Sequence, residues 1–197
     1  MVHIMRQWLL SLVFALFALP ALAAGEDVKA FADKLADSAL TIVKNEKLSE
    51  AEKQTQLEAL FKTNVDIQWV AKFVMGKHWK AATEQQRTDY LSNYEKFILK
   101  NYTSKLTNYS GQEYKILDAK KDADGDYLLT MEVVSSNGDP NVLMDYRIRK
   151  VATGFKIFDI IVEGVSMITT QRSEFGSVIT NQGIEYLIEA LKKKTAS

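Results

Sequence analysis

The side chains that could perform catalysis are sparse in this chain. The tripeptide Gly164-Val165-Ser166 matches the first part of the nucleophile turn of a serine hydrolase, but the closing glycine of that motif is missing. His78 is the only histidine after position 3, so it would have to act as the sole imidazole base. The chain has no cysteine that could join this histidine in a zinc site. We therefore expect no catalytic serine and no metal centre.

Carboxylates are the remaining candidates for catalytic groups. Asp145, Asp159 and Glu163 lie near one another in the C-terminal half, and two carboxylates in one pocket can act as general acid and general base. Carboxylates on adjacent strands are commonly paired with cations, and Arg147 or Arg172 could fill that role. We predict a structural ion pair, with Asp159 and Glu163 partly buried. A small-molecule enzyme with a carboxylate pair remains an alternative.

The segments that carry these carboxylates have the patterns of antiparallel strands. Between Asn141 and Arg149 apolar residues alternate with polar ones, which is the period of a strand with one solvated face. The run from Phe155 to Val162 is apolar on both faces, so we expect this strand to be central and covered on each side. Hairpin turns such as Asp124-Gly125 predict a meander of four strands, at roughly 112–118, 126–136, 141–150 and 155–167.

Helical patterns precede and follow the strands. Capping boxes that start at Ser49 and Thr83 mark two helix starts, and Asp66 and Gly76 suit the beginning and end of a short helix between them. Amphipathic stripes add helices at about 28–43, 166–180 and 183–194. This order predicts an α+β fold in which N-terminal helices pack on a curved four-stranded antiparallel sheet, with short C-terminal helices.

The first 23 residues have the pattern of a secretory signal peptide. Arg6 precedes an apolar run from Trp8 to Leu19, and Ala21-Leu22-Ala23 fits the cleavage site. The run is shorter than the roughly twenty residues of a membrane-spanning helix. We therefore expect cleavage of residues 1–23 and a single domain over residues 24–197. The absence of cysteine also removes the acceptor for an N-terminal lipid anchor.

The charge balance disfavours some partners. Without Arg6, 24 basic residues stand against 25 acidic ones, which gives a net charge of −1 with no long block of one sign. Nucleic-acid binding relies on a basic surface, so we expect no nucleic-acid partner. No stripe indicates self-association, and a monomer is expected.

Several blocks of the sequence resemble the toluene-tolerance or MlaC family. They are FVMGKHW at 73–79, DYRIRK at 145–150, FDIIVEGVS at 158–166 and QRSEF at 171–175. The resemblance runs from about residue 28 to residue 191 and departs at Phe155, where the family usually has tryptophan. Members of this family are the periplasmic phospholipid-binding components of the Mla lipid-transport system.

The resemblance implies a soluble periplasmic carrier without enzymatic activity. Phospholipid would be its cargo, with no cofactor, and the acyl tails would lie in an NTF2-like cone between helices and sheet. The carrier would exchange lipid with an outer-membrane lipoprotein–porin complex and an inner-membrane ABC transporter complex, and so maintain the lipid asymmetry of the outer membrane. Such contacts would be transient, because a shuttle must leave each end.

The pocket of such a carrier must hide acyl tails, whose exposure to water costs about 0.8 kcal/mol per methylene. Methionine and aromatic side chains suit a flexible tail. The predicted lining comprises Val70, Phe73, Val74, Phe97, Tyr102, Leu129, Met131, Val133, Met144, Tyr146, Ile148, Phe158, Ile160 and Val162. The same residues could instead fill a solid core, which would make the protein a periplasmic interaction module.

Cations near the pocket mouth are candidates for contact with a lipid phosphate. Guanidinium groups bind phosphate through two parallel hydrogen bonds. The predicted headgroup contacts are Arg147, Arg149, Lys156 and Arg172.

Overall fold

The structure is a computed structural model that describes residues 20–107, 112–135, 138 and 140–196. Most of the predicted signal peptide lies outside these residues. The elements, in chain order, are α1 (Pro20–Val43), α2 (Glu50–Asn64), α3 (Ile67–Met75), α4 (His78–Ala81), α5 (Glu84–Thr107), β1 (Glu113–Lys121), β2 (Tyr127–Val134), β3 (Val142–Val151), β4 (Gly154–Val162), β5 (Val165–Ser166), α6 (Met167–Gln182) and α7 (Ile184–Ala196). The predicted α+β class is confirmed.

The predicted helix starts are confirmed by their hydrogen bonds. Ser49 accepts from the backbone N–H of Glu52, and the Glu52 carboxylate accepts from the backbone N–H of Ser49, which completes the capping box of α2. Thr83 and Gln86 exchange the same pair of bonds before α5. The side chain of Asp66 caps α3, and Gly76 ends it at a φ of 56°. The short helix α4 was not predicted.

The strands form one antiparallel sheet in the order β1-β2-β3-β4-β5. The fourth strand is shorter than predicted, because Glu163 and Gly164 adopt positive φ angles of 49° and 81° and turn the chain. Val165 then pairs back with Val162, which creates a fifth strand that the sequence analysis missed. Glu163 is exposed in this turn, so the prediction that it is partly buried is wrong.

The strand that is apolar on both faces, β4, lies near the edge of the sheet rather than at its centre. Among the described residues, only the two residues of β5 and a bridge from Val65 to Ile157 lie beyond it. At this bridge the N–H of Asp66 donates to the carbonyl of Ile157 at 2.9 Å. The predicted coverage of both faces is confirmed, since Phe158 packs among helices and Ile157 packs toward α1. Its apolar faces therefore result from two flanking cores and not from a central place in the sheet.

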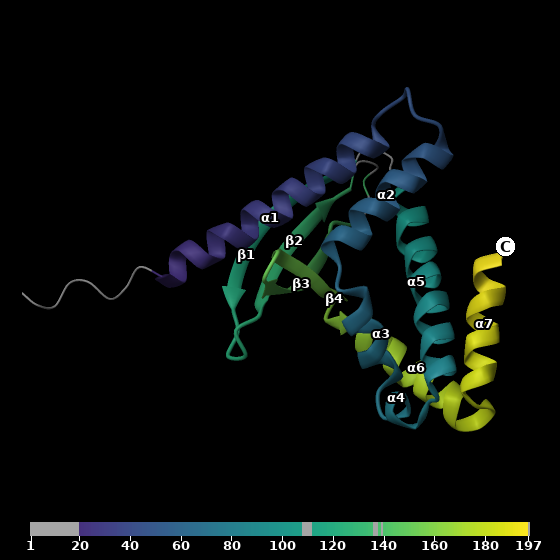
Figure 1. The fold of residues 1–197 in the computed structure, drawn as a ribbon. Helices are drawn as coiled ribbons and strands as arrows, with labels where there is room; N and C mark the ends of the chain where they lie inside the picture. The colour runs from purple at the N-terminus through teal and green to yellow at the C-terminus, as the bar shows by residue number, and fades with distance from the viewer. Residues whose placement is uncertain (1–19, 108–111, 136–137, 139, 197) are drawn as a thin grey trace, which may run out of the picture.

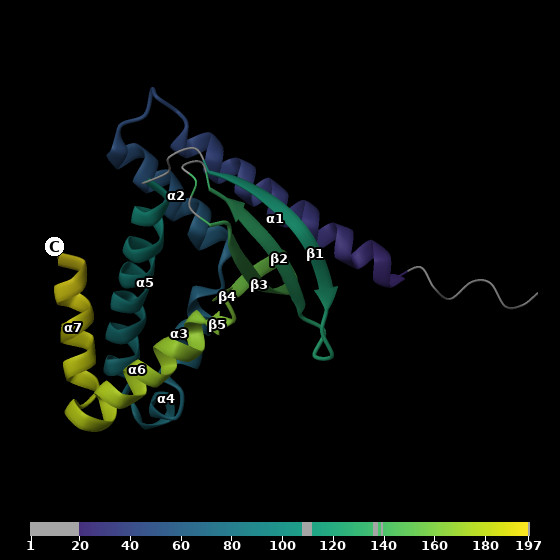
Figure 2. The same ribbon diagram turned by 180° about the vertical axis from the view of Figure 1, so that it is seen from behind.

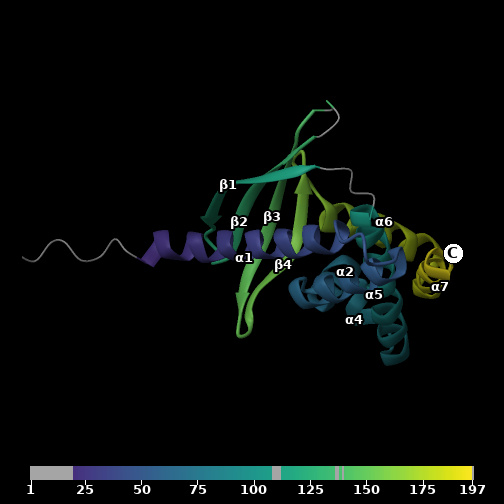
Figure 3. The same ribbon diagram turned by 90° about the horizontal axis from the view of Figure 1, so that it is seen from above.

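These two cores divide the molecule. One is built by α3, α5, α6 and α7 together with Phe158. The other joins α1 to the inner face of the sheet, through Val28 and Phe31 against Tyr127 and Phe155. Figures 1 and 2 show the result as two arms, one of α1 with the sheet and one of helices, and Figure 3 shows α1 crossing the strands.

Candidate functional site

An apolar cavity of about 550 Å³ lies between α1, α2 and the inner face of the sheet. Its lining comes from every element around it: Ala32, Leu35, Ala36, Ala39, Leu40, Leu57, Leu60, Phe61, Asn64, Val65, Tyr102, Gln112, Glu113, Tyr114, Met131, Val133, Met144, Tyr146, Ile148, Ile157, Ile160, Val162 and Met167. Aliphatic, methionine and aromatic side chains dominate this lining. It has the size and character of a pocket for an apolar ligand.

Small residues on α1 keep the cavity open. Ala32, Ala36 and Ala39 recur at helical spacing on the side of α1 that faces the sheet, and all three line the cavity. Larger side chains on the opposite wall, such as Met144 and Ile160, project toward them. Because alanine extends only a methyl group from the helix, α1 can cross the sheet without filling the space beneath it.

The polar groups of the lining are few, and three of them are the hydroxyls of Tyr102, Tyr114 and Tyr146. The hydroxyl of Tyr114 lies 2.9 Å from a carboxylate oxygen of Asp33 and 2.9 Å from one of Asp37, both on α1. Burial, followed by these hydrogen bonds, raises the pKa of Tyr114 well above its usual value. Burial also raises the pKa of Tyr146 to about 12 and, together with the charge of Asp159, raises the pKa of Tyr102. All three hydroxyls are therefore neutral at physiological pH.

Charge is nearly absent from the cavity. Among the residues that the structure describes there, Glu113 is the only charged lining residue, and no lysine, arginine or histidine takes part. Eight of the predicted lining residues are found on this wall: Tyr102, Met131, Val133, Met144, Tyr146, Ile148, Ile160 and Val162.

Six predicted lining residues lie elsewhere. Val70, Val74 and Phe158 are buried in the helical core, and Phe73 and Phe97 pack against that core. Leu129 is fully buried in the core between α1 and the sheet. The contributions of α1 and α2 to the lining were not predicted. Leu57, Leu60 and Phe61 form an apolar stripe at helical spacing on α2, but this spacing does not indicate which wall the stripe faces.

None of the four cations predicted at the headgroup lines the cavity. Arg149 forms an ion pair with Asp126 at 3.2 Å and lies over the rings of Trp69 and Phe158. The guanidinium of Arg147 also lies over Phe158, at 4.8 Å. Lys156 donates a hydrogen bond to the carbonyl of Thr63.

Arg172 lies apart from the other three cations. Its guanidinium lies 4.7 Å from the centre of the Phe73 ring, on a separate polar groove. The headgroup prediction therefore has no support from the lining of the cavity.

The carboxylates that would serve an enzyme point away from the cavity. Asp145 lies between Met144 and Tyr146, two cavity residues, so its side chain projects from the other face of β3 and accepts from Thr130 at 2.6 Å. The buried Asp159 accepts from the Ser166 hydroxyl at 2.7 Å and from the backbone N–H of Ile168 at 3.2 Å. The predicted ion pair of Asp159 with Arg147 or Arg172 is not formed in the described part of the chain.

No cluster of three or more histidine, aspartate or glutamate side chains able to hold a metal ion occurs within residues 20–107, 112–135, 138 and 140–196. Over those ranges, none of the helices combines the length and the apolar character needed to span a bilayer.

The fold and the cavity define a class: an α+β protein in which N-terminal helices and an antiparallel sheet enclose an apolar chamber. The model of the MlaC protein family matches residues 33–193, and the chain belongs to this family. The family prediction is thereby confirmed.

Two known proteins are similar to this chain. The intermembrane phospholipid transport system binding protein MlaC of Haemophilus influenzae is 24% identical over 135 residues, which span 67% of this chain and 63% of that relative. A phospholipid-binding protein of Ralstonia solanacearum, solved in complex with a phospholipid, superimposes with a TM-score of 0.71 at 23% identity. That match covers 88% of this chain and 97% of the solved one, and it supports the fold.

Proposed function

We propose that this protein is a phospholipid carrier that holds acyl tail in the cavity between α1, α2 and the sheet. The observation that carries the proposal is an apolar chamber of about 550 Å³ in a member of the MlaC family. The name of the Haemophilus relative and the bound lipid of the Ralstonia protein support the same assignment.

The driving force for loading is the removal of hydrocarbon from water. Each buried methylene contributes about 0.8 kcal/mol, so a dozen methylenes contribute roughly 10 kcal/mol. No single polar contact approaches this value, since a hydrogen bond contributes about 1 kcal/mol net. The carrier therefore recognises its cargo through the tail.

The headgroup lies outside the chamber in this proposal. Glu113 is the only charge among the described lining residues, so the wall offers no cation to a phosphate. An anionic headgroup would lose hydration inside such a wall without gaining a partner, which is costly. The carrier should accordingly accept lipids with different headgroups.

We further propose that the protein works in the periplasm, after removal of its signal peptide, as a shuttle. It would exchange lipid with an inner-membrane ABC transporter complex and an outer-membrane lipoprotein–porin complex, and so serve outer-membrane lipid asymmetry. Weak docking at each end suits this role, because dissociation must be fast for transfer. The names of the family and of its relative support a part in lipid transport.

The two alternative functions lack comparable support. An acid–base enzyme would need its carboxylates in the chamber, whereas Asp145 and Asp159 lie on the other face of the sheet. An interaction module with a solid core would leave no space behind α1, and the cavity contradicts this.

Two neighbouring residues on β3 provide the test. Met144 lines the cavity, and Leu143 points outward with 52% of its surface exposed. Met144→Glu would place an unpaired carboxylate among apolar side chains, which costs several kcal/mol on burial. We expect it to lower lipid affinity at least about 100-fold, while Leu143→Glu retains wild-type lipid.

Native mass spectrometry of both variants, purified from cells, reads the result directly. The expected outcome is a phospholipid adduct on the wild type and on Leu143→Glu, and bare protein for Met144→Glu. Equal phospholipid adducts on both variants, or a wild type that never carries lipid, would contradict the carrier assignment.

A further inference from the structure

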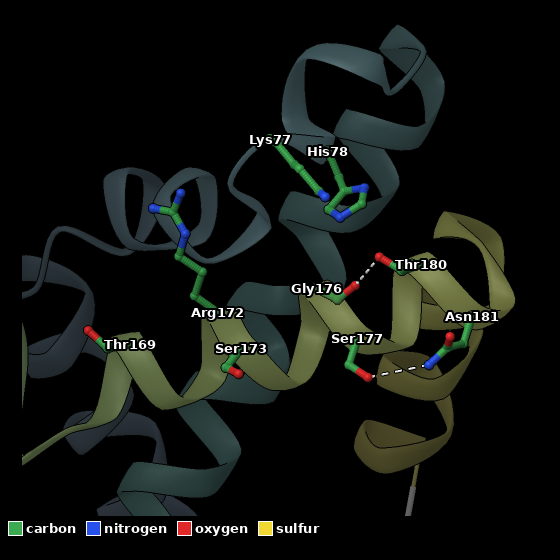
Figure 4. Close-up of a pocket in the computed structure, with 9 residues that line it drawn as sticks. All are labelled: Lys77, His78, Thr169, Arg172, Ser173, Gly176, Ser177, Thr180 and Asn181. Atoms are coloured by element: carbon green, nitrogen blue, oxygen red, sulfur yellow. Dashed lines mark hydrogen bonds between the residues drawn. The ribbon is translucent and has the colours of Figure 1, made fainter.

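A second hollow, polar in character, lies at the other end of the molecule. It is a groove between the α3–α4 turn and α6, lined by Lys77, His78, Thr169, Arg172, Ser173, Gly176, Ser177, Thr180 and Asn181. It shares no lining residue with the apolar cavity. Figure 1 shows α4 and α6 far from the connection between α1 and α2, and Figure 4 shows the side chains that face the groove.

Arg172 is held in place but keeps its donors available. Its guanidinium lies over the ring of Phe73 at 4.7 Å and against Gly76, whose missing side chain leaves room for it. A Cβ at Gly76 would come within 3.1 Å of the Arg172 Nε. Within the described parts of the chain, no hydrogen-bond acceptor or carboxylate satisfies this guanidinium. An ordered guanidinium without an acceptor is suited to bind an anion.

Lys77 contributes an ammonium group from the opposite wall, where the imidazole of His78 also lines the groove. Figure 4 shows both side chains extending from the α3–α4 turn toward Gly176 of α6. The Nε2 atom of His78 is buried and has no hydrogen-bond partner. Such an atom is costly to leave unsatisfied, so a ligand that reaches it would gain a contact.

The remaining lining is made of hydroxyl and amide groups. Thr169, Ser173 and Ser177 recur every four residues on α6, which places their hydroxyls along one face of the helix. Thr180 bonds to the carbonyl of Gly176, and Asn181 bonds to Ser177. No carboxylate is present among the described residues of the groove. The groove therefore combines positive charge with many small donors.

We propose that this groove binds a phosphate group. The oxygens of a phosphate accept hydrogen bonds from several directions, which matches donors supplied by two separate walls. A planar carboxylate would satisfy the guanidinium but leave the imidazole and the ammonium on the facing wall without a partner. The phosphate can be free in solution or part of a lipid headgroup at a bilayer surface. In either case the site is independent of the apolar cavity.

The test uses inorganic phosphate and the purified protein at constant ionic strength. NMR signals of α6 and of the His78 ring should shift in a saturable way. Arg172→Gln and Lys77→Gln should each weaken binding about tenfold, since each removes a charged hydrogen-bond donor. Lys47→Gln, the same loss of charge at an exposed residue between α1 and α2, should bind as the wild type does.

A second arm distinguishes the two sources of phosphate. Co-sedimentation with phosphatidylglycerol vesicles that is lost in both groove variants identifies a lipid headgroup. Binding of inorganic phosphate without vesicle binding identifies free phosphate, and both results support the site.

Three results would overturn the proposal. They are a wild type that responds to neither probe, affinities that do not change in the variants, and binding of an acidic peptide such as poly-glutamate in place of phosphate. Circular dichroism checks the fold of each variant. If Arg172→Gln does not fold, Lys77→Gln decides the outcome, because Lys77 is exposed.

Discussion

The hydroxyl of Tyr114 on β1 lies 2.9 Å from Oδ1 of Asp33 on α1. Asp37, one helical turn further along, is at the same distance from this hydroxyl. Tyr114 also lines the apolar cavity. The contact therefore ties the edge of the sheet to the helix that covers the chamber, next to Glu113, the charged residue of the described lining.

Tyr114→Phe should loosen this connection. Loss of the hydroxyl removes about 1 kcal/mol of net hydrogen bonding, which corresponds to about fivefold faster release of bound lipid if α1 must lift for exit. Transfer of a fluorescent phospholipid from the loaded protein to vesicles measures the release rate. Tyr186→Phe, an exposed tyrosine on α7, is the control. Equal release from all three proteins would show that α1 does not gate the chamber.

Ala36→Trp should fill the chamber. The indole would occupy space that Ala36 leaves open on α1, so the variant should lose most of its co-purified lipid while it stays folded, at a cost of about 1–3 kcal/mol from crowding. Ala30→Trp places the same side chain on an exposed part of α1. Lipid quantified after solvent extraction should be reduced in the first variant only. Full lipid content in Ala36→Trp would contradict the assignment of this wall.

Replacement of Gly76 and of Gly176 by alanine should change the stability of the protein in opposite directions. Gly76 has a φ of 56°, and a Cβ there would press on Arg172, so Gly76→Ala should destabilise the protein by about 2 kcal/mol. Gly176 lies inside α6 with nothing near its missing Cβ, so Gly176→Ala should stabilise by about 0.5–1 kcal/mol. Urea unfolding gives both values. Equal midpoints would argue against the turn geometry at Gly76.

Alkaline pH should destabilise the fold through Tyr146. Burial raises its pKa to about 12 in the folded protein, whereas the unfolded chain has the ordinary value near 10. Between about pH 10 and 12 the unfolded state binds fewer protons, so the stability that Tyr146 contributes is complete below pH 10 and decreases as the pH rises toward 12. Tyr146→Phe should flatten this part of the stability profile, as measured by urea unfolding at each pH. An unchanged slope would mean that other tyrosines dominate.

Strand periodicity correctly grouped many of the cavity residues, and a bulge limited how far it could be applied. Met144, Tyr146 and Ile148 alternate on β3 and share the inner face. On β4, Phe158 has the same parity as Ile160, but the register shifts between Arg147 and Ile148. The shift turns Ile157 toward the cavity and Phe158 toward the helices. A single extra residue reverses the phase of a strand, and nothing in the local pattern indicates where it occurs.

The sequence by itself determined most of the local elements of this protein, with α4 and β5 as the exceptions. Capping side chains, turn residues and apolar periodicity act over a few neighbouring positions, so Ser49, Asp66 and Thr83 mark helix starts wherever the helices later pack. It also determined the family, because the blocks around Asp145 and Phe158 are contiguous in the chain.

The tertiary structure alone decided which apolar residues enclose a space and which fill a core. Val74 and Val162 are alike in chemistry, yet one is buried among helices and the other lines the cavity. It also separated Arg172 from the apolar site and placed it in one groove with His78, on the facing wall. These outcomes depend on how α1 crosses the sheet and how α6 leaves it. Such placements arise from contacts between segments distant in sequence, which local patterns do not encode.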